Sequence, residues 1–294
     1  MVKVLILGGT QFFGKKLVQR LIDQQAEVTI VTRGIKPDPF GDMVKRICVD
    51  RTDAAALAEA VGGSSFDVIY DNICFSPKEA REAVHLFSGR TSKYIVTSSM
   101  SVYPFGEEPL TEQVFDPYTC ELPEPDTFSS LSYADGKRLV EAVFMQEAPF
   151  PVAAVRFPIV LGPDDYTRRL HFHIEHVQKE IAIGMPAPAA RLSFIHSNEA
   201  AEFLDWLGKS ELTGPINACS QGKVGLNQIM SLIERNVGKR AKIVEEASEQ
   251  HQSPFGVPAS WYMDTSKAES AGFAFKHIDG WLPELIDLLA KTKQ

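Results

Sequence analysis

The sequence of 294 residues has little cysteine, no long apolar run and no cluster of basic residues. Its cysteines are widely scattered and form no Cys-x-x-Cys pair; they are Cys48, Cys74, Cys120 and Cys219. We therefore expect buried free thiols rather than a disulfide framework or a zinc site. At the N-terminus, one lysine and a short apolar run precede the first glycine, which is too little for a secretory signal or a membrane span. These absences favour a cytoplasmic protein without a membrane partner.

Positive charge is also scarce, since 30 Lys and Arg residues stand against 38 Asp and Glu residues and the net charge is −8. Because a phosphate backbone rewards clustered Lys and Arg, this balance argues against nucleic acid as a partner. The chain has no internal repeat and no low-complexity tract. Its length and its 44% hydrophobic content favour one large α/β domain with a smaller appended lobe.

The first twenty residues have the pattern of a strand, a tight turn and a helix. An apolar run over 4–7 ends at Gly8, and apolar residues recur at helical spacing over 17–22. Gly8 can take a turn conformation that side chains disfavour, and Gly14 would let the helix pack close to the strand. Such a turn directs free N–H groups and the positive end of the helix dipole at a pyrophosphate. The alternative is a plain strand-to-helix connection, which has the same local pattern.

Strand and helix patterns then alternate along the chain. Strands are predicted over 27–34, 44–50, 66–71, 93–99 and 151–156, and helices over 53–61, 77–88 and 132–144. This alternation predicts a parallel, doubly wound sheet. Residues 104–130 are rich in Pro, Glu, Asp and Thr, and they predict a long surface loop of a kind that is often functional.

The end of the second predicted strand bears on which dinucleotide the turn would bind. An NAD-selective site usually carries an acid there, whereas this chain has Thr32 and Arg33, with Lys36 close behind. An arginine suits a 2′-phosphate by its charge and its forked donors. We therefore predict NADP as the cofactor, with NAD as the alternative; the other reading of Arg33 is the start of a solvated loop.

Tyr133 and Lys137 stand four apart on a predicted helix and share one face. An ammonium about 4 Å from a phenol would stabilise the phenolate by roughly 4 kcal/mol at an effective dielectric near 20. That equals about three pKa units, enough for the phenol to act as a base near neutral pH. Ser99, at the end of a predicted strand, is the candidate third member, which would bind the substrate oxygen or else cap a turn.

These residues make the chain resemble the extended short-chain dehydrogenase/reductase superfamily of NAD(P)-dependent epimerases, dehydratases and reductases. The resemblance covers nearly the whole chain, with motifs at 8–14, 98–103, 133–137 and 156–163 and related segments at 193–197 and 264–268. It implies a Rossmann-type α/β fold. The NAD(P)-binding domain would span 1–162 with a returning strand near 214–219, and 163–294 would form mainly a smaller C-terminal substrate-binding lobe.

The resemblance also implies roles for individual residues. Ser99, Tyr133 and Lys137 would be the catalytic set, with Tyr133 as acid/base and Lys137 also bonded to the nicotinamide ribose. Asp50 would meet the adenine, and residues 157–160 would lie beside the nicotinamide ring. With the turn and Arg33, the predicted cofactor-binding residues are Gly8, Thr10, Gln11, Phe12, Phe13, Gly14, Arg33, Asp50, Tyr133, Lys137, Pro158 and Val160.

Several residues depart from the family pattern. Gln11 replaces the middle glycine of the usual GxxGxxG loop, and its side chain would either crowd the pyrophosphate or contact it. Leu192 stands where sugar-nucleotide enzymes commonly carry an arginine; Arg191 is one place away, which on a strand is the opposite face. Trp261-Tyr262-Met263 likewise stand where another arginine is expected. These departures weaken the case for a nucleotide-sugar substrate.

A basic and aromatic segment begins the second lobe. Arg168 or Arg169 would either meet an anionic substrate or lie on a solvated face. The nearby histidines are His171, His173 and His176. Helical spacing brings only the last two together, with no third ligand by spacing, so no metal site is predicted.

The leading hypothesis is an NADP(H)-dependent oxidoreductase or epimerase/dehydratase-like enzyme. It would act at a hydroxyl or carbonyl carbon of a small polar substrate, with a sugar as one candidate. The segment 162–169 also resembles an atypical branch that includes the chloroplast stem-loop-binding proteins. That branch supplies the alternative, a redox-sensing or RNA-binding protein that retains the dinucleotide fold. Family members often form homodimers through the helices that include the one carrying Tyr133.

Overall fold

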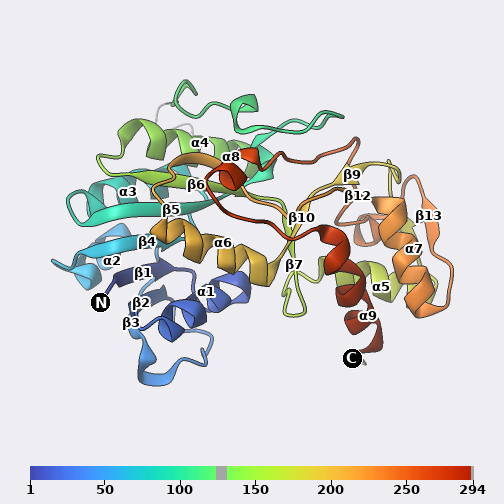
Figure 1. Cartoon of the computed structure of the whole chain (residues 1–294), viewed down its shortest axis with the longest axis horizontal. Coiled ribbons are helices and arrows are strands. Elements are labelled where there is room, and N and C mark those ends of the chain that lie inside the picture. Colours follow the sequence, from blue (N-terminus) through green and yellow to red (C-terminus); the bar gives the residue numbers. More distant parts are fainter. Residues whose placement is uncertain (124–130, 293–294) are drawn as a thin grey trace.

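The computed structural model describes residues 1–123 and 131–292, and it contains a seven-stranded sheet (Figure 1). Its strands are β1 (Lys3–Leu7), β2 (Glu27–Thr32), β3 (Lys45–Cys48), β4 (Phe66–Asp71), β5 (Thr91–Ser99), β6 (Val152–Phe157) and β11 (Gly214–Asn217). They lie in the order β11-β6-β5-β4-β1-β2-β3, and each pairing is parallel. Parallel neighbours require crossover connections, which the helices supply.

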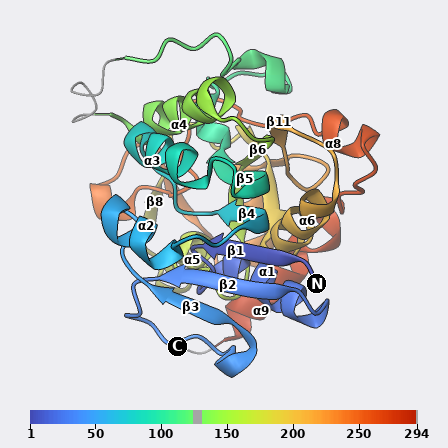
Figure 2. The same ribbon diagram turned by 90° about the vertical axis from the view of Figure 1, so that its left-hand side faces the viewer.

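Helices cover both faces of this sheet (Figure 2). One face carries α1 (Phe12–Asp23) and α6 (Ser197–Lys209), and the other carries α2 (Ala54–Val61), α3 (Pro77–Phe87) and α4 (Tyr133–Glu147). Strand β1 serves both layers, because successive side chains point to opposite faces. Val4 and Ile6 join the core under α1 and α6, whereas Leu5 and Leu7 join the core under α2, α3 and α4. The predicted doubly wound α/β fold is confirmed.

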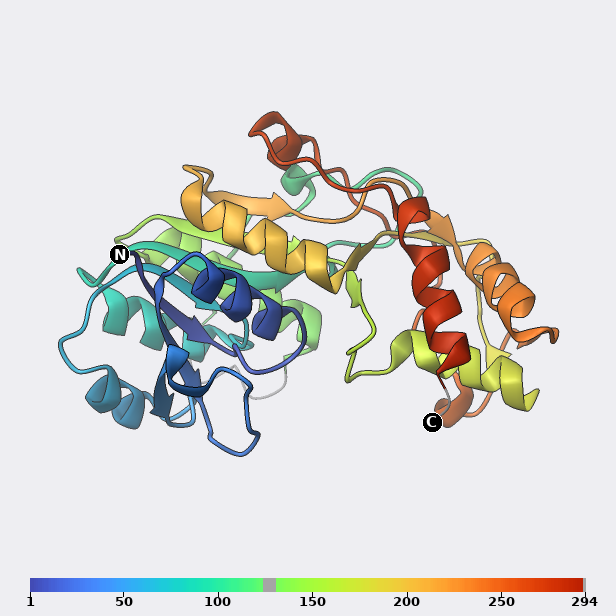
Figure 3. The same ribbon diagram turned by 60° about the horizontal axis from the view of Figure 1, so that its bottom comes forward.

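A second lobe with its own apolar core lies beside the sheet (Figures 1 and 3). It holds α5 (Arg169–Lys179), α7 (Leu226–Val237) and α9 (Leu282–Lys291). Its short strand pairs are β7 (Ile159–Leu161) with β10 (Phe194–His196), β9 (Arg191–Leu192) with β12 (Val224–Gly225), and β8 (Ala182–Gly184) with β13 (Lys242–Val244). The chain returns from this lobe to the sheet to form α6 and β11, and α8 (Ser266–Ser270) packs near β11.

Short 3₁₀ turns complete the secondary structure. They are η1 (Gly41–Met43), η2 (Met100–Val102), η3 (Glu112–Val114), η5 (Glu249–His251) and η6 (Ile278–Gly280). The predicted surface loop over 104–130 contains η3, and its last part, 124–130, lies outside the described residues. Among the described helices, none is long and apolar enough to cross a membrane.

The cysteines match the sequence expectation only in part. All four are free, which agrees with the expected lack of a disulfide framework. Cys74 and Cys219 are buried, but Cys48 is exposed and Cys120 is half-buried. Cys48 ends β3, next to the sheet edge, and this position leaves its side chain accessible.

A buried ion pair ties α4 to β6. The Arg156 Nε donates to Glu141 at 3.0 Å and its Nη2 donates at 2.6 Å, and both side chains are fully buried. The remaining guanidinium donors reach the Tyr103 hydroxyl at 2.7 Å and the carbonyl oxygens of Glu112 and Phe115 at 3.0 and 2.9 Å. The Glu141 carboxylate raises the pKa of Arg156 against the opposing effect of burial. One arginine therefore connects the helix that carries Tyr133 with the segment 103–115.

We expect Arg156→Met to lower the free energy of unfolding by about 3–5 kcal/mol, because it leaves the Glu141 carboxylate buried without a counterion. Urea denaturation followed by circular dichroism measures this change. Lys291→Met breaks an exposed pair with Asp287 and should cost less than about 1 kcal/mol. Equal losses for the two variants would contradict the structural role of the Arg156 pair.

Candidate active site

The turn after β1 has the close approach that its glycines predict. Gly8 has φ +85°, and a Cβ on Gly14 would lie 2.3 Å from the Gly8 carbonyl oxygen, so neither position accepts a side chain without a shift. The Gln11 side chain makes no capping hydrogen bond at the N-terminus of α1. Because the first N–H groups of a helix have no partner within the helix, this turn presents them to an anion.

A cavity of about 480 Å³ opens over this turn, at the carboxyl ends of β1, β2 and β4. The predicted cofactor residues that line it are Gly8, Thr10, Gln11, Phe12, Phe13, Gly14, Arg33 and Asp50. In the sheet, β1 lies between β2 and β4. The chain builds β2 and β3 outward on one side of β1 and then β4, β5 and β6 outward on the other side. Crevices of this kind are the usual ligand sites of doubly wound sheets.

Further residues of the cavity were not identified from the sequence. They are mainly Asn72, Ile73 and Phe75, from the segment that follows β4, and Tyr166, from the segment before α5. The Asn72 Oδ1 accepts a hydrogen bond from Thr97 at 2.8 Å. One sequence signal could have pointed to this segment. The polar pair at 71–72 stands at the end of a buried strand, where ligand-binding residues of parallel sheets commonly lie.

The end of the cavity beside β2 is positively charged. Arg33 and Lys36 line it, and in the described part of the chain neither side chain forms an ion pair or a hydrogen bond. Asp50 accepts hydrogen bonds from the Thr52 N–H at 2.9 Å and hydroxyl at 2.7 Å, and these bonds lower its pKa. Arg51 also lines the cavity but is bound to Asp71.

None of the three predicted catalytic residues lines this cavity, but Tyr133 and Lys137 both lie near Phe75, which does. Ser99 ends β5, and its hydroxyl accepts a hydrogen bond from the Ser101 N–H at 3.1 Å. The Tyr133 ring lies 6.5 Å from the ring of Phe75. Lys137 is fully buried on the next turn of α4, with Nζ 5.9 Å from the centroid of the Tyr133 ring. The substrate would have to reach the phenol from the exposed side of Tyr133.

The structure differs from the expected electrostatics of Tyr133. Its pKa is raised rather than lowered, because desolvation of the phenol disfavours the phenolate. Lys137 Nζ donates to the carbonyl oxygens of Cys74 and Thr97, both at 2.8 Å. Burial lowers the pKa of this lysine as well. The estimate from helical spacing omitted these long-range contacts.

Pro158 and Val160 do not line the cavity. Both are buried in the connection from β6 through β7, close to Phe157. The Phe157 ring lies 5.6 Å from the ring of Phe13, which follows the phosphate turn. The connection therefore packs against α1 beneath the candidate site rather than lining the cavity.

The other residues that the sequence analysis singled out do not line this cavity. Arg191 is exposed and pairs with Glu107 at 3.0 Å, whereas Leu192 is buried. His173 binds the Ser253 hydroxyl, and His176 Nε2 lies 3.0 Å from His251 Nδ1. Among the described residues, no group of three or more His, Cys, Asp or Glu could hold a metal ion.

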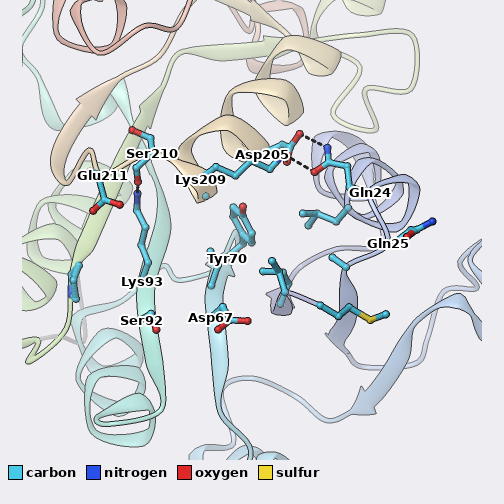
Figure 4. A pocket seen from close by; sticks show the side chains of 18 of the residues that line it. Gln24, Gln25, Asp67, Tyr70, Ser92, Lys93, Asp205, Lys209, Ser210 and Glu211 are labelled. Atoms are coloured by element: carbon cyan, nitrogen blue, oxygen red, sulfur yellow. Dashed lines mark hydrogen bonds and ion pairs between the residues drawn. The ribbon is translucent and has the colours of Figure 1, made fainter.

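A larger cavity, of about 860 Å³, lies at the opposite edge of the sheet (Figure 4). Two of its charged residues, Lys93 and Asp205, already form hydrogen bonds within the protein. Lys93 Nζ donates to the carbonyl oxygens of Leu207 and Ser210 at the end of α6. Asp205 accepts a hydrogen bond from Gln24 at 2.7 Å (Figure 4). This cavity contains none of the predicted site residues.

The chain is similar to several known proteins. The chloroplast stem-loop binding protein of 41 kDa b from Arabidopsis thaliana is 24% identical over 304 residues, which span 96% of this chain and 75% of that protein. The UDP-glucose 4-epimerase of Thermus thermophilus, solved with NAD, has a TM-score of 0.73 at 15% identity, over 99% of this chain and 100% of that one. The UDP-N-acetylglucosamine 4-epimerase of Methanobrevibacter ruminantium has a TM-score of 0.72 at 19% identity, over 99% and 97%.

These two structures, at less than 25% identity, show a shared fold. The family follows from the sequence, because the model of the NAD dependent epimerase/dehydratase family matches residues 4–219, which include the phosphate turn, Ser99, Tyr133 and Lys137. The chain belongs to the NAD dependent epimerase/dehydratase family.

Proposed function

We propose that this protein is an NADP-dependent oxidoreductase or epimerase-type enzyme that acts at a hydroxyl or carbonyl carbon of a small polar, sugar-like substrate. The observation that carries the proposal is the adjacency of two features. Phe75 lines the cavity over the turn after β1, and the centroid of its ring lies 6.5 Å from that of Tyr133 and 4.5 Å from Lys137 Nζ. Cofactor and acid/base would therefore meet at one place.

The residues present fit a phosphorylated dinucleotide. A Cβ at Gly14 would fill the turn, and Gln11 leaves the start of α1 uncapped. Arg33 and Lys36 line the adenosine end, where a 2′-phosphate would receive two positive charges. The solved epimerase of Thermus thermophilus contains NAD, so the preference for NADP depends on this chain's own Arg33.

The chain's residues would divide the chemistry between them. The bound nicotinamide would supply hydride transfer. Tyr133 would exchange a proton with the substrate oxygen, and the Ser99 hydroxyl would hold that oxygen beside the phenol. Lys137, bound to two main-chain carbonyls, would hold the backbone next to Tyr133 in place. The third N–H of its ammonium group would donate to a ribose hydroxyl.

RNA binding is the second candidate, and the similarity to the chloroplast stem-loop binding protein favours it. The net charge of −8 argues against it. Binding of a labelled RNA stem-loop, measured by fluorescence anisotropy at low and high salt, separates the two candidates. We expect no binding at micromolar concentration; salt-dependent binding in that range would favour the RNA function.

We expect NADPH to bind tighter than NADH, and Arg33→Ala to weaken NADPH binding by roughly 10- to 100-fold while NADH binding changes little. The range corresponds to the loss of one charge-assisted hydrogen bond. Reduced-nicotinamide fluorescence measures both affinities. Arg240→Ala, which removes an exposed arginine of the second lobe, is the control and should leave both unchanged. A wild type that prefers NADH would contradict the assignment of Arg33.

We expect Tyr133→Phe to lower turnover by at least about 100-fold without weakening NADPH binding, because it removes the proton that the phenol exchanges. Turnover is followed by nicotinamide absorbance in a screen of hydroxy and keto compounds, including free sugars. Tyr118→Phe, at another exposed tyrosine, should keep full activity. An active Tyr133→Phe protein would exclude the phenol as acid/base.

A further inference from the structure

One aromatic side chain from outside the sheet domain lines the cavity over the turn after β1. Tyr166 lies in the connection between β7 and α5, which runs between the sheet domain and the second lobe (Figure 3). Among the described residues, every other member of the cavity wall belongs to the segment 8–79. Tyr166 is 63% exposed, so its ring borders the open cavity without being covered by the protein.

The ring of Phe12 holds this connection against the turn. The centroids of the Phe12 and Tyr166 rings lie 6.2 Å apart and the rings are nearly perpendicular, which is a favourable edge-to-face contact. Phe12 is buried although its φ of +49° is uncommon for a residue with a side chain. A Cβ at Gly162 would lie 3.2 Å from the Phe12 ring. The connection therefore approaches Phe12 closely because position 162 has no side chain.

Polar contacts fix the same connection to α1. Lys16 Nζ lies 2.9 Å from the Asp164 carboxylate and donates to the Ser197 hydroxyl at 2.6 Å. The buried Asp165 side chain accepts hydrogen bonds from the Thr167 N–H at 2.9 Å and the Thr167 hydroxyl at 2.6 Å. The backbone on both sides of Tyr166 is thus held in place, so the ring has a defined position beside the turn.

The order of the strands places Tyr166 away from Arg33. Arg33 follows β2, which lies on one side of β1. The connection with Tyr166 continues from β6 through β7, and β6 lies on the other side of β1, as does β4, which Phe75 follows. A dinucleotide whose 2′-phosphate meets Arg33 would therefore extend its nicotinamide half toward Tyr166 and Phe75.

We propose that Tyr166 is a cofactor-binding residue whose ring packs on the nicotinamide half of the bound dinucleotide. The proposal rests on the proposed function, because it needs a dinucleotide in the cavity. A ring fixed at the border of an open cavity offers its exposed apolar surface to a ligand at little entropic cost. Because Tyr166 directly precedes α5, its contact would link cofactor binding to the second lobe.

The first test compares two nucleotides by isothermal titration calorimetry. NADPH has both halves, whereas adenosine 2′,5′-bisphosphate lacks the nicotinamide half. Tyr166→Ala should weaken NADPH binding by roughly 10-fold, as expected for the loss of an aromatic ring that packs on a nucleotide, and should leave binding of the bisphosphate unchanged. Tyr166→Phe should keep most of the wild-type affinity. Tyr118→Ala, at another exposed tyrosine, is the control and should bind both as the wild type does.

The second test uses the wild-type chain. Tetranitromethane nitrates accessible tyrosines, and Tyr166 and Tyr118 are exposed to similar extents, 63% and 55%. Saturating NADP⁺ should bring the nitration of Tyr166, measured by peptide mass spectrometry, below that of Tyr118. Nitration of Tyr118 should not change.

NADPH binding by Tyr166→Ala within twofold of the wild type would overturn the role of Tyr166 and leave the proposed function intact. Unchanged nitration of Tyr166 with NADP⁺ bound would do the same. Equal losses of NADPH and bisphosphate binding would also overturn it, because the effect would then not belong to the nicotinamide half. A wild type that binds neither NADPH nor NADH would contradict the proposed function and this role together.

Discussion

The buried pair between Arg156 and Glu141 is the interaction on which the candidate site depends. It joins α4, which carries Tyr133, to β6, and the same guanidinium holds the carbonyl oxygens of Glu112 and Phe115. Two charges without solvent are tolerated here because the donors of the arginine meet acceptors on several elements. The position of the helix is thereby coupled to the segment that follows β5, which ends at Ser99.

The two edges of the sheet have different chemistry although each has a cavity. At the carboxyl edge, the turn over Gly8 and Gly14 leaves N–H groups free, and Arg33 stays unpaired in the described part of the chain. At the opposite edge, Lys93 binds the carbonyl oxygens that end α6. A helix ends in unsatisfied carbonyls and begins with unsatisfied N–H groups. The direction of the helices therefore makes the carboxyl edge the one that can bind a dinucleotide.

Burial decides the electrostatics at Tyr133 and Lys137. Desolvation raises the pKa of the Tyr133 phenol and lowers the pKa of the Lys137 ammonium, so it disfavours the charged form of each group. Lys137 is held in place by two carbonyl oxygens, those of Cys74 and Thr97.

The sequence by itself determined the doubly wound fold, the glycine turn after β1 and the shared helix of Tyr133 and Lys137, because periodicity and glycine placement act over a few residues. It also predicted that Arg33 and Asp50 lie at the dinucleotide cavity, since both follow strands whose ends meet at one edge. Only the tertiary structure decided the partners of Lys137 and the places of Phe75 and Tyr166. Those contacts join segments far apart in the chain, and desolvation depends on all the atoms that surround a group.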